Sequence, residues 1–367
     1  MRMGRFILYL GVASAILFSL IVSFVWEAVI PAEAPMITAP TASSTLSVMP
    51  AIVPTAPPPS SVPEKVPAPS PTVSAPAKVE PTPAPTLSAE EAAALLEESA
   101  YLLRAALVNI ICYAPAESGL HSISGSGVIV DSKGIILTNA HIAQYFLLYS
   151  RGISCTIRAG SPASDRYEAA IIYISPAWIT TNATILTQEN PTGTGEYDFA
   201  FLAITKPAPG ASALPSSFPS IPLALSPTYK DAPVVIASYG AQFLESSQIQ
   251  SSLFPTVVFG SVKNVFTFST TVDVLALGGS AAAQEVSSGG GISDIKGELV
   301  GTITTSTTNG AIGARRLGAI TATYIRAEYE REAGNTLDTL LAQPIATAIA
   351  VFAPQIPTLE AILTANL

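Results

Sequence analysis

Short apolar runs of about five to nine residues follow one another along the chain from residue 106 onward. They are rich in Val, Ile, Thr and aromatic residues, and Gly, Ser, Pro or Asn separate them, which is typical of strands joined by turns. The runs are residues 106–114, 124–130, 134–140, 154–160, 167–175, 198–204, 233–240, 256–262, 266–274, 298–305 and 316–325. Because no helical pattern of about 10–15 residues separates them, antiparallel barrels or sandwiches are favoured over βαβ units.

Helical patterns lie on either side of these runs. Residues 88–107 carry Leu and Tyr near helical spacing, and Ser88 followed by Glu91 predicts a capping box at their start. At the other end, residues 324–334 and 336–352 contain few turn residues. The folded part is therefore predicted to be mostly β, with helices at both ends.

The first 30 residues have the pattern of a membrane anchor. After two arginines, residues 6–30 are apolar with Glu27 as their only charge, and about 20 such residues span a bilayer. The basic residues before this segment and the acidic ones after it place the N-terminus in the cytoplasm and the rest of the chain outside. A cleaved signal peptide is the alternative, since residues 32–34 (Ala-Glu-Ala) resemble a cleavage site between small residues.

A proline-rich segment follows the anchor. Residues 31–87 hold about half of the 31 prolines, mixed with Ala, Ser, Thr and Val. Proline fixes φ and removes a hydrogen-bond donor, so this segment is predicted to be a disordered, semi-rigid spacer. The predicted organisation is an anchor over 1–30, a linker over 31–87, a folded domain over 88–330 and a C-terminal helical extension over 331–367.

Charge and histidine content narrow the function. The chain has a formal charge of -9 and only 12% charged residues, which argues against a nucleic-acid partner because phosphates are bound by clustered Lys and Arg. It has only two histidines, His121 and His141, and they match no zinc-binding spacing such as H-E-x-x-H. No metal and no other cofactor is therefore expected. One histidine is nevertheless enough to act as the base in nucleophilic catalysis.

The segment around His141 resembles a catalytic motif. Residues 126–131 (SGVIVD) and 134–141 (GIILTNAH) resemble the hairpin and histidine motif of trypsin-like serine proteases, most closely of their HtrA-type branch. The resemblance extends over roughly residues 105–326 and implies a double antiparallel β-barrel, with His141 as general base. His121 matches nothing in the family and is expected to be a surface or packing residue. No PDZ domain is expected, because about 40 residues follow the resemblance.

Two further motifs supply the other members of a Ser-His-Asp triad. Asp198 precedes a strand of the D-[apolar]-A-x-L-x-I type that this family places after its aspartate, where it would orient the histidine. Residues 286–291 (VSSGGG), followed by a Gly-Glu-Leu-Val-Gly hairpin, resemble the family's nucleophile segment G-x-S-G-G-P and place the catalytic serine at Ser288. Ser280, which follows two glycines, and Ser287 are the alternatives.

The resemblance also assigns the groups that would contact the substrate. The N–H groups of Val286 and Ser288 would hold the oxyanion. The strand after the serine would pair with the substrate backbone, through Gly301, Thr302, Ile303 and Thr304. Val286 departs from the family, which has glycine at this position, and a β-branched residue disfavours positive φ. A catalytically weak or inactive form is therefore an open alternative.

The two cysteines, Cys112 and Cys155, lie on predicted strands on either side of the His141 motif. Disulfides persist outside the cytoplasm, and an even count is consistent with one bridge. Two unpaired buried thiols fit the sequence as well.

Taken together, these patterns predict a single-pass, membrane-anchored serine endopeptidase whose catalytic domain lies outside the cytoplasm and acts on polypeptide substrates. A pseudoprotease that binds peptides or proteins at the cell surface is one alternative. An anchored surface or adhesion domain is another. The sequence does not indicate an oligomeric state.

Overall fold

The structure is a computed structural model, which describes residues 87–188, 194–241, 244–268, 271–278, 288–306 and 317–367. The predicted membrane anchor and all of the predicted linker except residue 87 lie outside the described residues, as do Val286 and the alternative nucleophiles Ser280 and Ser287. The described residues belong to one compact unit of the chain, Glu80–Leu367.

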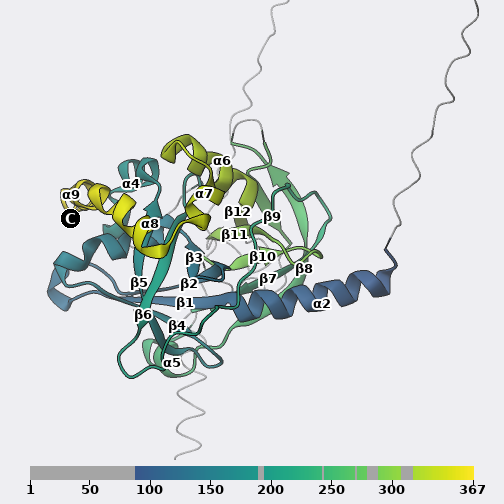
Figure 1. The fold of residues 1–367 in the computed structure, drawn as a ribbon, viewed down its shortest axis with the longest axis horizontal. Coiled ribbons are helices and arrows are strands. Elements are labelled where there is room, and N and C mark those ends of the chain that lie inside the picture. Colours follow the sequence, from purple (N-terminus) through teal and green to yellow (C-terminus); the bar gives the residue numbers. More distant parts are fainter. Residues whose placement is uncertain (1–86, 189–193, 242–243, 269–270, 279–287, 307–316) are drawn as a thin grey trace, which may run out of the picture. The chain divides into compact units, whose positions relative to one another are not determined.

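The first six strands close into an antiparallel barrel (Figure 1). In their order around the barrel they are β1 (Leu107–Tyr113), β2 (Ile123–Asp131), β3 (Ile135–Thr138), β6 (Ala200–Pro207), β5 (Ser164–Ile174) and β4 (Ser154–Ala159). β2 and β3 form a hairpin whose turn requires Gly134, because its φ of 93° is costly for other residues. The N–H of Gly134 donates to the carbonyl of Asp131 at 2.9 Å and closes this turn. The hairpin thus delivers the end of β3, and the histidine that follows it, to one rim of the barrel.

The remaining six strands close a second antiparallel barrel. In order they are β10 (Gly291–Ser293), β11 (Leu299–Ser306), β12 (Leu317–Thr321), β9 (Val274–Leu277), β8 (Thr256–Phe266) and β7 (Pro233–Ser238). Fully buried aliphatic side chains such as Ile236, Ile292 and Ile320 fill it. The two barrels confirm the predicted fold class, a double antiparallel β-barrel with helices at both ends.

Two predicted strands are wrong in part. The strand predicted over 316–325 ends at Thr321, and helix α6 (Ala322–Ala333) begins at the next residue. The sequence predicts a continuous strand over 266–274, but β8 ends and β9 begins inside this range. The buried carboxylate of Asp273 organises the turn between them, accepting hydrogen bonds from the N–H of Phe268 at 2.7 Å and from the hydroxyls of Thr267 and Thr271. The residue composition does not predict this turn, because threonine hydroxyls and an aspartate stabilise it rather than glycine or proline.

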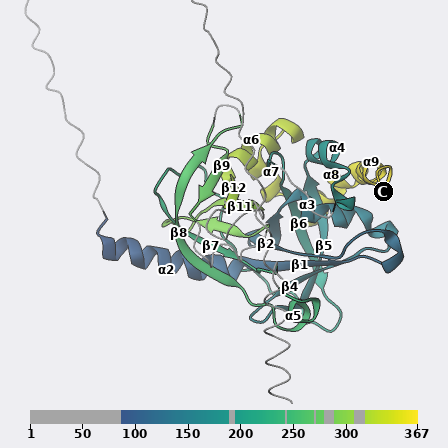
Figure 2. The same ribbon diagram turned by 180° about the vertical axis from the view of Figure 1, so that it is seen from behind.

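The helix that precedes the barrels, α2 (Ala89–Ala106), begins with the predicted capping box. The Ser88 hydroxyl accepts the N–H of Glu91 at 3.2 Å, and the Glu91 carboxylate accepts the N–H of Ser88 at 2.8 Å. The helix lies along β7 and β10 of the second barrel and then continues directly into β1 of the first (Figures 1 and 2). Its buried Ser99 is hydrogen bonded to Ser293 of β10 at 2.6 Å. α2 therefore ties the start of one barrel to the wall of the other.

The helices that follow the second barrel return to the first. They are α6 (Ala322–Ala333), α7 (Leu337–Ala342), α8 (Ile345–Phe352), the 3-10 turn η6 (Ala353–Gln355) and α9 (Ile356–Thr364). α8 packs on β5, and α9 packs on α4 (Pro176–Asn182) (Figure 1). Among the described residues, Ile345–Thr364 is the one stretch long and apolar enough to cross a membrane by length and composition. Its buried Phe352, Leu359 and Leu363 nevertheless join the core of the domain.

The short helical segments lie in the connections between strands. They are η1 (Ala116–Ser118), α3 (Ala140–Ala143), η2 (Gln144–Arg151), η3 (Ile185–Thr187) and α5 (Ser246–Ser251). The α5 segment, which lies between β7 and β8, is held by a buried arginine of the first barrel. Arg158 on β4 donates to the carbonyls of Ile249 at 2.8 Å and Gln250 at 2.6 Å. The cation thus meets the carbonyl end of α5, where the partial charge is negative.

Candidate active site

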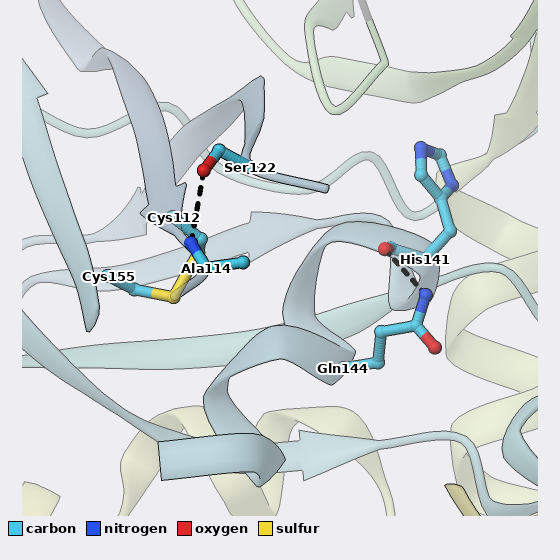
Figure 3. Close-up of a disulfide and its surroundings, with 6 residues drawn as sticks. All are labelled: Cys112, Ala114, Ser122, His141, Gln144 and Cys155. Atoms are coloured by element: carbon cyan, nitrogen blue, oxygen red, sulfur yellow. Dashed lines mark hydrogen bonds between the residues drawn. A yellow bond between two sulfur atoms is a disulfide. The ribbon is translucent and has the colours of Figure 1, made fainter. Parts of the chain in front are cut away.

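His141 lies just beyond the end of β3, in the first turn of the short helix α3. Asn139 occupies the N-cap position of this turn, and its side-chain amide donates to the carbonyl of Asp198 at 2.9 Å instead of capping the helix. The amide of Gln144 donates to the carbonyl of His141 at 2.9 Å (Figure 3). The imidazole is 29% exposed and points away from Gln144 and from the disulfide (Figure 3). The backbone of the histidine is therefore fixed while its ring stays accessible.

Asp198 stands at the turn before β6 and faces His141. Its Oδ2 lies 2.8 Å from Nδ1 of the imidazole, and its Oδ1 accepts the backbone N–H of His141 at 3.0 Å. The carboxylate is only 6% exposed. A buried carboxylate that accepts a hydrogen bond at each oxygen fixes both the position of the ring and the tautomer with its proton on Nδ1. The other ring nitrogen, Nε2, is then a proton acceptor.

Thr304 on β11 brings the second barrel to this pair. Its hydroxyl donates to Oδ2 of Asp198 at 2.5 Å. The pairing of β11 with β12 shifts register between Ile303 and Thr305, so Thr304 lies at a β-bulge. A bulge changes the direction in which a side chain points, which explains why this threonine reaches the aspartate. The sequence analysis predicts Thr304 to lie in a substrate-binding strand but does not predict this contact. The spacing of residues along β11 gives no sign of a bulge.

Ser288 begins a tight turn that the first barrel holds in place. The backbone N–H of Ser126 donates to the carbonyl of Ser288 at 2.8 Å. Gly289 has a φ of 82°, and a Cβ at this position would lie 1.9 Å from the carbonyl oxygen of Ser126. Only glycine fits there, because the backbones of the two barrels approach each other so closely. The glycine after the serine is thus a packing requirement of the site.

The hydroxyl of Ser288 is directed to Thr304 in this structure. Ser288 Oγ lies 3.4 Å from the main-chain oxygen of Thr304, a long hydrogen bond. No hydrogen bond joins it to the imidazole of His141 within the described residues. Thr304 thus links the three predicted residues: its hydroxyl contacts Asp198, and its carbonyl contacts Ser288. A change in the Ser288 rotamer toward the imidazole is needed for proton transfer between them.

The other predicted substrate-binding residues lie inside the wall of the second barrel. Gly301 and Thr302 pair with β10 on one side and with β12 on the other, and Ile303 pairs with Ala319 of β12. All three are buried. A substrate strand can pair with them only if one of these ladders opens. Thr304, at the bulge, is the one predicted residue outside both registers.

The sequence is compatible with both a disulfide and two free thiols at Cys112 and Cys155. In the structure Cys112 on β1 and Cys155 on β4 form a disulfide across directly paired strand positions (Figure 3). It closes a loop of sequence separation 43 that contains the whole hairpin and the histidine. Among the described residues no group of three or more His, Cys, Asp and Glu side chains is arranged to hold a metal ion.

The comparison with protein families agrees with this architecture. Residues 125–301 match the family model of the trypsin-like peptidase domain. A search of curated protein sequences finds no match. Among solved structures, the chain is similar to Rv3671c from Mycobacterium tuberculosis H37Rv, a serine-to-alanine mutant in an inactive form, with 17% identity, 69% of this chain and 95% of that chain covered, and a TM-score of 0.39. The match to the trypsin-like peptidase model therefore runs from Gly125 on β2 of the first barrel to Gly301 on β11 of the second.

Proposed function

We propose that the chain is a membrane-anchored serine endopeptidase that hydrolyses polypeptides outside the cytoplasm through a Ser-His-Asp triad. The trypsin-like peptidase domain supports a serine-type peptidase at the level of the family. The observation that carries the finer proposal is the 2.8 Å contact between Nδ1 of His141 and Oδ2 of Asp198. This contact orients the imidazole so that Nε2 is available to a nucleophile.

In the proposed reaction, Ser288 Oγ attacks the carbonyl carbon of a peptide bond while its proton passes to Nε2 of His141. Asp198 stabilises the imidazolium that forms. The N–H groups of Ser288 and Val286 are proposed to hold the tetrahedral oxyanion. Collapse of this intermediate expels the amine, which takes the proton from His141 and leaves an ester on Ser288. Water, deprotonated by His141, then hydrolyses the ester and restores the hydroxyl.

A second function is favoured by one observation. Ser288 Oγ contacts the carbonyl of Thr304 and not the imidazole. A pseudoprotease that binds peptides without cleaving them would keep the serine in this rotamer. The two functions differ in whether the hydroxyl reaches His141 when a substrate carbonyl is present.

The membrane location is proposed from residues 1–30 and 31–87, by their apolar and proline-rich composition. The peptidase domain would then lie beyond a spacer, on the side of the membrane away from the basic N-terminus. Polypeptides in that compartment are the proposed substrates, and the Cys112–Cys155 disulfide is compatible with such an oxidising location.

Labelling with a serine-directed fluorophosphonate tests the proposal. The full chain, solubilised in detergent, is expected to label, because the probe reacts with a serine that a histidine base activates. Ser288→Ala and His141→Ala are expected to abolish labelling, whereas Ser280→Ala and Ser287→Ala are expected to retain it. Labelling that survives Ser288→Ala would overturn the assignment of the nucleophile. A folded wild-type chain that neither labels nor cleaves an unfolded protein would support the pseudoprotease.

A further inference from the structure

The turn that presents Asp198 is held from outside the barrel by helix α6. Tyr197, the residue directly before Asp198, has a φ of 58°, which is uncommon for a residue with a Cβ. Its backbone N–H donates to the hydroxyl oxygen of Tyr324 on α6 at 3.1 Å. Tyr324 is buried, and this burial raises the pKa of its phenol above its ordinary value.

The turn itself is tightly wound. The N–H of Asp198 donates to the carbonyl of Gly195 at 3.2 Å, and the N–H of Phe199 donates to the carbonyl of Tyr197 at 2.8 Å. Asp198 therefore lies within two overlapping turns, and its carboxylate direction depends on the backbone angles of Tyr197. A left-handed conformation at a bulky residue is unfavourable and persists only where the surroundings hold it.

A second residue of α6 contacts the same tyrosine. The guanidinium carbon of Arg331 lies 5.3 Å from the centre of the Tyr197 ring, within range of a cation–π contact. Arg331 follows Tyr324 by seven residues, about two helical turns, so both lie on the same face of α6. One residue thus contacts the backbone of Tyr197 and the other contacts its side chain.

The position of Tyr324 is in turn fixed by the second barrel. Its N–H donates to the hydroxyl of Thr321, the N-cap of α6, at 3.0 Å. The Thr321 hydroxyl donates to the carbonyl of Val272 at 2.8 Å, and the Thr321 N–H donates to the carbonyl of Asp273 at 3.0 Å. The first turn of α6 is therefore attached to the turn between β8 and β9. The hydrogen bond to Tyr197 transmits this attachment to the first barrel.

We propose that Tyr324 is a positioning residue, whose hydroxyl holds Tyr197 in its left-handed conformation and thereby aims the carboxylate of Asp198 at His141. As a statement about catalysis, this rests on the proposed peptidase function. The geometric part of the proposal is independent of that function, because the contact between Asp198 and His141 can be observed directly.

Tyr324→Phe tests the proposal, with Tyr329→Phe as a matched control. Both tyrosines lie on α6 and both are buried, but the hydroxyl of Tyr329 donates to Oδ1 of Asn335 at 3.3 Å, and in the described part of the chain no hydrogen bond joins it to the Asp198 turn. Tyr324→Phe is expected to lower kcat by roughly 2- to 10-fold with KM changed by less than about twofold, as the loss of one hydrogen bond that positions a catalytic group. Tyr329→Phe is expected to leave both constants unchanged.

A readout independent of activity is the proton NMR resonance of His141 Nδ1–H. This proton is expected at low field in the wild type and in Tyr329→Phe, and to shift upfield or broaden in Tyr324→Phe. An unchanged resonance in Tyr324→Phe would overturn the proposal, whether or not the chain cleaves peptides. An inactive wild type with the expected shift would overturn the peptidase function and retain the positioning role.

A rescue experiment distinguishes the loss of this hydrogen bond from a general loss of stability in Tyr324→Phe. Glycine adopts positive φ without penalty, so Tyr197→Gly makes the left-handed conformation independent of Tyr324. Adding Tyr324→Phe to Tyr197→Gly is expected to shift the Nδ1 proton less than Tyr324→Phe shifts it in the wild type. An equal shift in both backgrounds would show that Tyr324 acts by another route and would overturn the proposal.

Discussion

The hydroxyl of Thr304 donates a hydrogen bond to the carboxylate of Asp198 across the boundary between the two barrels. The aspartate belongs to the first barrel and the threonine to the second. Because the same carboxylate contacts His141, the orientation of the imidazole depends on how the barrels are docked. The turn at Ser288 also depends on how the barrels are docked, because the N–H of Ser126 in the first barrel donates to the carbonyl of Ser288.

Removing the Thr304 hydroxyl is expected to impair catalysis. Thr304→Val keeps the shape of the side chain but leaves a buried carboxylate with one hydrogen bond fewer. Hydrogen bonds to charged groups contribute about 1.5–3 kcal/mol, so kcat/KM is expected to fall by about 10- to 100-fold. Thr304→Ser retains the hydroxyl and is expected to stay within a few-fold of the wild type. Steady-state cleavage of a fluorescent unfolded protein measures both, and equal activity of the valine and serine variants would contradict the role of this contact.

Neutralising the aspartate is expected to have a larger effect. Asp198→Asn preserves the size of the side chain but removes its negative charge and replaces one acceptor oxygen with an NH2 donor. The side chain can then no longer accept hydrogen bonds from both the imidazole and the backbone N–H of His141. In a Ser-His-Asp triad this change allows the wrong histidine tautomer and lowers kcat by about 10⁴-fold. The measurement is the rate of fluorophosphonate labelling. Labelling at the wild-type rate would mean that His141 is not oriented by Asp198.

Gly289 and Gly210 separate a steric effect from a backbone effect. Both have positive φ, 82° and 77°, but a Cβ at 289 would meet the carbonyl oxygen of Ser126 at 1.9 Å, and a Cβ at 210 would meet nothing within 4 Å. Gly210→Ala is expected to cost about 1–2 kcal/mol in the free energy of unfolding, because a residue with a Cβ is strained in the left-handed conformation. Gly289→Ala is expected to cost more and to abolish labelling, because the barrels must separate to admit the methyl group. Urea unfolding measures the costs, and equal costs would contradict the close approach of the barrels.

The disulfide is expected to stabilise the domain. Closing a loop with a sequence separation of 43 corresponds to about 4 kcal/mol on the chain-entropy model. The double variant Cys112→Ala/Cys155→Ala is expected to unfold at a lower urea concentration than the oxidised wild type. A reducing agent should lower the midpoint of the wild type toward that of the variant and leave the variant unchanged. A midpoint insensitive to both changes would argue against a structural bridge.

Buried Tyr145 predicts an alkaline limit of stability. Burial raises the pKa of its phenol from 10.0 to about 12. The folded state therefore holds this proton more tightly than the unfolded state, so the contribution to stability is complete below pH 10 and is lost as the pH rises through 12. Two pKa units correspond to about 2–3 kcal/mol. Tyr145→Phe is expected to flatten the fall in unfolding free energy between these pH values, as measured by urea titrations. An unchanged dependence of the unfolding free energy on pH in Tyr145→Phe would contradict this role of Tyr145.

Much of the fold can be predicted from local patterns in the sequence. The glycine turn between β2 and β3, the apolar strands and the capping box at Ser88 are set by neighbours within a few residues, and all are present in the structure. His141 and Asp198 are predicted because residues 138–141 (TNAH) and 198–204 (DFAFLAI) resemble the histidine and aspartate motifs of the family. Their distance of 2.8 Å agrees with the resemblance to the family, while their catalytic roles stay predictions.

The features that sequence reasoning missed depend on contacts between distant segments. Thr304 reaches Asp198 only because a bulge interrupts β11, and the bulge is set by pairing with β12. Tyr324 meets Tyr197 only because α6 returns to the first barrel. The turn at Asp273 likewise depends on a buried carboxylate amid residues that favour strands. No periodicity within a single segment encodes these contacts.

The return of the C-terminal helices bears on how the chain folds during synthesis. Glu332 on α6 accepts hydrogen bonds from Tyr173 and Ser175 of the first barrel, and the ring of Phe352 lies 6.2 Å from that of Tyr173. Glu332 and Phe352 follow all strands of both barrels in the chain and are therefore synthesised after them. The half of the domain that carries the histidine therefore waits, with an aromatic surface uncovered, for residues translated more than 150 positions later. A nonsense mutation ahead of Glu332 would consequently remove both Glu332 and Phe352 and leave Tyr173 of the first barrel without these partners.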